Sequence, residues 1–107
     1  SVDSIPTEAN QEDHVSMGPI AARKARSVVG HVRQVIAIEI LAACQALDFV
    51  APLLPGRGVL AVHEAVRRSV PFMERDRVLA DDIRTLEALV RDGSLRAAAE
   101  KACAGLR

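Results

Sequence analysis

Five polar residues that could take part in catalysis follow one another near the start of the sequence: Asn10, Gln11, Glu12, Asp13 and His14. Carboxylates and a histidine can transfer protons, and side-chain amides can orient the polar groups of a ligand. No HxxxH or HxH pattern accompanies them, so the spacing does not favour a metal site. From the residues alone, the cluster is either part of an active site or the polar lead-in to a helix.

The segment that must position this cluster is a long helix. Residues 1–14 are polar and have no sustained period, which is typical of a loop, whereas helix formers dominate residues 15–50. Carboxylates just before a helix stabilise its amino end by about 0.3–1 kcal/mol. The middle of the helix, VIAIEILAAC, is apolar on nearly every face, so it must be buried on every side. Its single carboxylate, Glu39, is expected to pair with an arginine of a neighbouring helix.

Residues 51–107 predict only short helices, over about 59–70, 80–91 and 94–104. Three short helices with one apolar stripe each cannot surround a helix about 50 Å long. We therefore expect an all-α fold in which a long central helix and short C-terminal helices form part of a larger helical bundle. Other chains, or further parts of the same protein, must cover the long helix.

The composition supports helices and excludes some partners. Half of the 107 residues are hydrophobic but only 2% are aromatic, which favours helices over sheets. Fourteen basic and fourteen acidic residues cancel, so no global charge attracts nucleic acid or an anionic membrane. The longest apolar run, residues 35–44, is shorter than the roughly 20 residues of a membrane span, and a cytoplasmic protein is expected. Cys44 and Cys103 are expected to be reduced and buried, with a disulfide as the alternative.

Three blocks of the sequence resemble, in order, the C-terminal part of the histidine ammonia-lyase family. The most specific is SIPTEANQEDHVSMGPIAARKA at residues 4–25, followed by IAIEILAACQALDF at residues 36–49 and VPFMERDRVLADDI at residues 70–83. The resemblance implies an all-helical, cytoplasmic homotetramer whose long helices bundle at the centre. It also implies active sites that are assembled from more than one subunit.

The resemblance further implies a reaction, which is the non-oxidative elimination of ammonia from L-histidine to give urocanate. The family uses a methylidene-imidazolone (MIO) electrophile that forms autocatalytically from an internal Ala-Ser-Gly, without a metal. Ala-Ser-Gly does not occur in these 107 residues. The chain alone is therefore expected to be inactive, and the prosthetic group is expected to come from the remainder of the enzyme.

The same resemblance assigns roles to the polar cluster. Glu12 matches the family's active-site glutamate, which lies near the substrate imidazole, and a carboxylate is suited to hydrogen-bond an imidazole N–H. Gln11 and Asn10 match its neighbours and are expected to shape the substrate pocket. Asp13 and His14 are expected to hold the loop and to start the helix behind the substrate-contacting residues.

One departure leaves the substrate open. Glu8 stands where histidine-type members more commonly have a serine, and related aryl ammonia-lyases carry a glutamate near that position. A lyase or aminomutase for another aromatic amino acid is therefore an alternative, with Glu8 as a substrate-binding residue. A third alternative is a non-catalytic helical oligomerisation module, which absence of Ala-Ser-Gly from the complete gene would favour.

Overall fold

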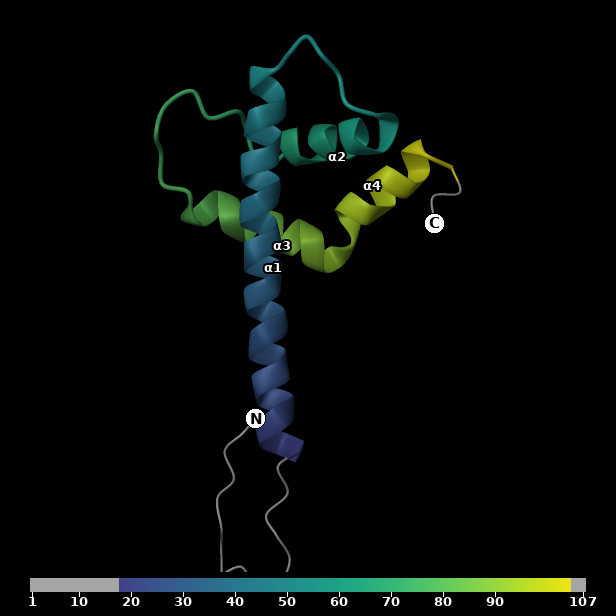
Figure 1. The fold of residues 1–107 in the computed structure, drawn as a ribbon. Coiled ribbons are helices and arrows are strands. Elements are labelled where there is room, and N and C mark those ends of the chain that lie inside the picture. The colour runs from purple at the N-terminus through teal and green to yellow at the C-terminus, as the bar shows by residue number, and fades with distance from the viewer. Residues whose placement is uncertain (1–17, 105–107) are drawn as a thin grey trace, which may run out of the picture. The chain divides into compact units, whose positions relative to one another are not determined.

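A computed structural model describes residues 18–104, and every regular element among them is an α-helix (Figure 1). In chain order the helices are α1 (Gly18–Phe49), α2 (Arg57–Arg67), α3 (Ala80–Asp92) and α4 (Ser94–Ala102). The expected all-α fold with a long first helix is therefore confirmed for the part of the chain that the structure describes.

Prolines mark both ends of α1. Pro19 is the second residue of the helix, where a missing N–H does no harm because first-turn N–H groups have no intrahelical partner. The helix ends at Phe49, one residue before the expected end at Val50, and Pro52 follows and cannot continue the helical hydrogen bonds. The expected start near Val15 lies outside the described residues.

Helix α2 lies two to three residues earlier than expected, over Arg57–Arg67 instead of 59–70. The carbonyl of Gly56 accepts the first helical hydrogen bond, from the Leu60 N–H at 2.9 Å. At the other end, Pro71 disfavours a helical conformation at Val70, because the proline ring crowds the residue before it. The chain consequently leaves the helix through a turn before the proline is reached.

Gly93 separates α3 from α4. Its φ of 81° is left-handed, which a glycine adopts without the steric cost that a Cβ would add. Asp81 and Asp82 occupy the first turn of α3, where negative charge suits the helix dipole, and Arg77 Nε donates to Asp82 Oδ2 at 2.8 Å. Helix α4 ends at Ala102 instead of the expected residue 104.

The contacts divide the chain into two compact units, residues 1–32 and residues 33–107. In the second unit, α2 and α3 each pack against α4. Its core consists of seven buried residues that come from all four helices and the turn after α2: Ala37, Cys44, Ala65, Val66, Val70, Leu86 and Leu95. This core is what holds the second half of α1 to the three short helices.

Most of the side chains of α1 are exposed to solvent. Only Ala37 and Cys44 of its 32 residues are buried. Large apolar side chains along it are exposed, among them Val28 at 54% and Val35 at 55%. The expectation that this helix needs further protein around it therefore agrees with the exposure of its surface.

Two expectations about α1 can be compared with the structure. Glu39 is exposed and makes no hydrogen bond or ion pair with another residue in 18–104, so the expected arginine partner is not found in the part of the chain that the structure describes. The short helices pack on the face of Ala37 and Cys44, which Glu39 does not share. By length and composition α1 could also cross a membrane, since an 18-residue window has a mean hydropathy of 1.5. The core helix of a soluble protein passes the same test.

Candidate functional site

The predicted site residues lie outside the part of the chain that the structure describes. This holds for Glu8, Asn10, Gln11 and Glu12, and for Asp13 and His14 behind them. Their roles stay predictions that rest on the sequence. The described residues contribute instead the helix that follows this segment and the elements packed on it.

A cluster of charged side chains joins the end of α1 to α2. Asp48, in the last turn of α1, accepts a hydrogen bond from His63 Nε2 at 2.8 Å on one carboxylate oxygen. Its other oxygen accepts from Arg67 Nε at 2.9 Å and from Nη2 at 2.5 Å, which is a two-bond guanidinium contact. His63 and Arg67 are four residues apart on α2 and so share a face of that helix. Residues from two helices thus converge on one carboxylate.

The cluster is partly removed from solvent, since its three side chains retain only 17–24% of their exposure. Burial is the largest single effect on the pKa of Asp48 and raises it, but the hydrogen bonds and electrostatic interactions with Arg67 and His63 together lower it by more, so the pKa lies below its ordinary value. Because an ionised carboxylate can only accept, His63 carries its proton on Nε2 in this arrangement. Arg67 also donates from Nη1 to the Val70 carbonyl at 2.9 Å, which fixes the turn after α2.

A histidine and an aspartate in contact can activate a nucleophile, but the cysteine near this pair is unsuited to that role. Cys44 is buried, one turn before Asp48. Burial raises the pKa of its thiol, and the opposing effect of Arg67 does not offset this, so the thiol stays protonated and unreactive. Both Cys44 and Cys103 are free, so the structure has no disulfide between them, but only Cys44 is buried and Cys103 is partly exposed, unlike the prediction. We infer that Asp48, His63 and Arg67 form a structural link between α1 and α2, which we call the clamp.

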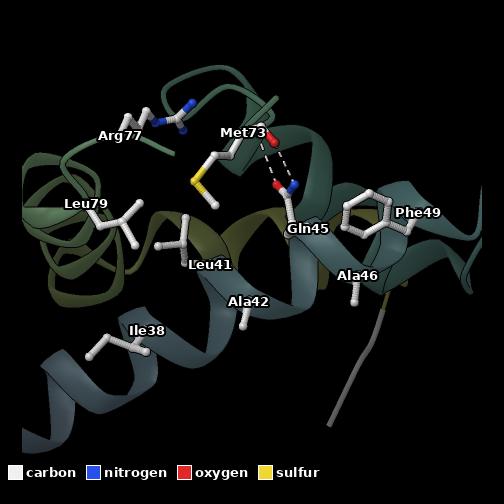
Figure 2. A pocket seen from close by; sticks show the side chains of 9 residues that line it. All are labelled: Ile38, Leu41, Ala42, Gln45, Ala46, Phe49, Met73, Arg77 and Leu79. Atoms are coloured by element: carbon white, nitrogen blue, oxygen red, sulfur yellow. Dashed lines mark hydrogen bonds between the residues drawn. The ribbon is translucent and has the colours of Figure 1, made fainter. Parts of the chain in front are cut away.

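An apolar groove lies between α1 and the segment that connects α2 to α3 (Figure 2). One face of α1 and three residues of the connecting segment line it: Ile38, Leu41, Ala42, Gln45, Ala46, Phe49, Met73, Arg77 and Leu79. Gln45 closes one side, because its amide donates to the Met73 carbonyl at 2.9 Å and accepts from the Met73 N–H at 3.1 Å. The Phe49 and Phe72 rings meet edge to face, with centroids 5.7 Å apart.

The polar groups of this groove are already engaged within the chain. Arg77 donates to the Pro71 carbonyl at 2.7 Å and to the Phe72 carbonyl at 3.3 Å, besides its pair with Asp82. A site that orients an amino acid needs polar groups that face the ligand. The groove therefore has the chemistry of a packing surface. Among residues 18–104, no group of three histidine, cysteine or acidic side chains could hold a metal ion.

Sequence reasoning missed the Asp48 cluster, although two signals for it were present. His63 and Arg67 occur four residues apart on an amphipathic helix, and Asp48 is an acidic residue near the end of an apolar one. Their convergence depends on how α2 packs against α1, which periodicity does not specify.

Comparison with known proteins identifies the segment. The model of the family "Aromatic amino acid lyase" matches residues 1–68. A histidine ammonia-lyase of Myxococcus xanthus (strain DK1622) is 55% identical over 104 residues, which is 97% of this chain and 20% of that enzyme. A histidine ammonia-lyase of Natranaerobius thermophilus is 50% identical over 107 residues, or 100% of this chain and 21% of that enzyme.

Solved structures agree with these relatives. The histidine ammonia-lyase of Trypanosoma cruzi superimposes with a TM-score of 0.83 at 44% identity, over 94% of this chain and 20% of that one. A tyrosine aminomutase from Streptomyces globisporus superimposes with a TM-score of 0.85 at 35% identity, over 97% of this chain and 20% of that one. The chain spans about a fifth of the length of the relatives that it matches. With this sequence match and this shared fold, the chain belongs to the aromatic amino acid lyase family.

Proposed function

We propose that the chain is the C-terminal part of a cytoplasmic ammonia-lyase that eliminates ammonia from L-histidine to give urocanate. The observation that carries this proposal is 50–55% identity to histidine ammonia-lyases over nearly the whole chain. The match to the tyrosine aminomutase structure is weaker in sequence, at 35%. Histidine is therefore the favoured substrate within the family.

In the proposed reaction, this chain supplies side chains that bind and orient the substrate. The Glu12 carboxylate accepts a hydrogen bond from an imidazole N–H and stabilises positive charge on the ring. Gln11, Asn10 and Glu8 shape the pocket around it, and Asp13 and His14 hold the segment at the start of α1. All six residues precede the described part of the chain, so the proposal for them rests on the sequence match.

The family's electrophile, MIO, does not form from the residues of this chain. The Ala-Ser-Gly from which it forms is absent from the 107 residues, so we propose that the rest of the complete protein supplies it. The complete enzyme would be a homo-oligomer, and a tetramer is the state that the family resemblance favours. The exposed apolar surface of α1 supports such an assembly.

The test is the substitution Glu12→Ala in the complete enzyme, followed by the absorbance of urocanate. We expect turnover of L-histidine to fall by about a hundredfold or more, as is typical when a group that stabilises developing charge is removed. Folding and subunit number should not change. Glu74→Ala, at an exposed carboxylate with no ion pair among the described residues, is the matched control. Near-normal turnover in the Glu12 variant would remove this residue from the mechanism.

A lyase or aminomutase acting on another aromatic amino acid is the second candidate, favoured by Glu8 and by the similarity to a tyrosine aminomutase structure. The two candidates separate when the complete enzyme is assayed with several aromatic amino acids. Formation of urocanate supports the first candidate, and a cinnamate-type product or a β-amino acid without urocanate supports the second.

A further inference from the structure

We draw no further inference here: the strongest candidate, the apolar groove between the second half of α1 and the segment that connects α2 to α3, carries none because nothing among residues 18–104 shows what covers it.

Discussion

Removing the charge of Asp48 should destabilise the second unit, because this carboxylate joins α1 to α2. Asp48→Asn removes a charge that accepts three hydrogen bonds, one from His63 and two from Arg67. A hydrogen bond to a charged group contributes about 1.5–3 kcal/mol, but these three share one carboxylate and the side chains remain 17–24% exposed. We therefore expect the free energy of unfolding to fall by about 2–3 kcal/mol, which is less than the sum of three bonds.

Urea unfolding followed by circular dichroism measures this loss. With a slope of about 1–3 kcal/mol per molar urea, a loss of about 2–3 kcal/mol should lower the midpoint by roughly 0.7–3 M at constant protein concentration. Asp76→Asn, at an exposed carboxylate without an ion pair among the described residues, is the matched control and should have little effect. The double variant Asp48→Asn with Arg67→Met should lose less stability than the two single variants added together. A loss below about 0.5 kcal/mol in Asp48→Asn would refute the clamp, since ordinary surface substitutions reach that size.

Three further predictions concern Asp48 and the glycines of the chain. The pKa of Asp48 is lower in the folded state than in the unfolded state, so its stabilising effect is present above the unfolded pKa and is lost as the pH falls through the folded pKa. The difference in unfolding free energy between wild type and Asp48→Asn should therefore shrink below about pH 4. Urea titrations repeated at several pH values measure this difference. Gly58→Ala should stabilise α2 only when Cys103 is also replaced by alanine, by about 0.5–1 kcal/mol in thermal melts, because a Cβ at Gly58 would lie 3.0 Å from the Cys103 sulfur. Gly93→Ala should cost about 1 kcal/mol because φ is 81°, whereas Gly30→Ala, in open space on α1, should raise the melting temperature.

Local signals in the sequence account for most of the helix boundaries. Gly93 ends α3 because a residue in the left-handed conformation stops a helix. Pro52 follows α1 closely and cannot continue its hydrogen bonds, so the helix ends before it. Helix α2 ends at Arg67, three residues before the predicted end, and a turn lies between it and Pro71, which disfavours a helical conformation at Val70. Errors of this size are expected where a turn and a helix compete for the same hydrogen bonds.

Of the two polar clusters, the sequence predicted the one at Glu12 but not the one at Asp48. The polar cluster at Glu12 was identified by its resemblance to a family, because the residue types alone fit a helix lead-in equally well. The clamp of Asp48, His63 and Arg67 could not be identified from the sequence, because none of the three residues is unusual by itself. Which residues meet across two helices depends on their rotation and crossing, and no periodic pattern contains that information.

The sequence by itself determined that the chain is helical and that α1 requires more protein than the chain provides. Both follow from local properties: the propensity and punctuation of each segment, and apolar residues on all sides of one helix. The tertiary structure alone decided which face of α1 is used within the chain and which faces stay exposed. The core around Ala37 and Cys44 buries one face of α1 and leaves Glu39 without a partner among residues 18–104, because side chains far apart in sequence meet only after the helices have packed.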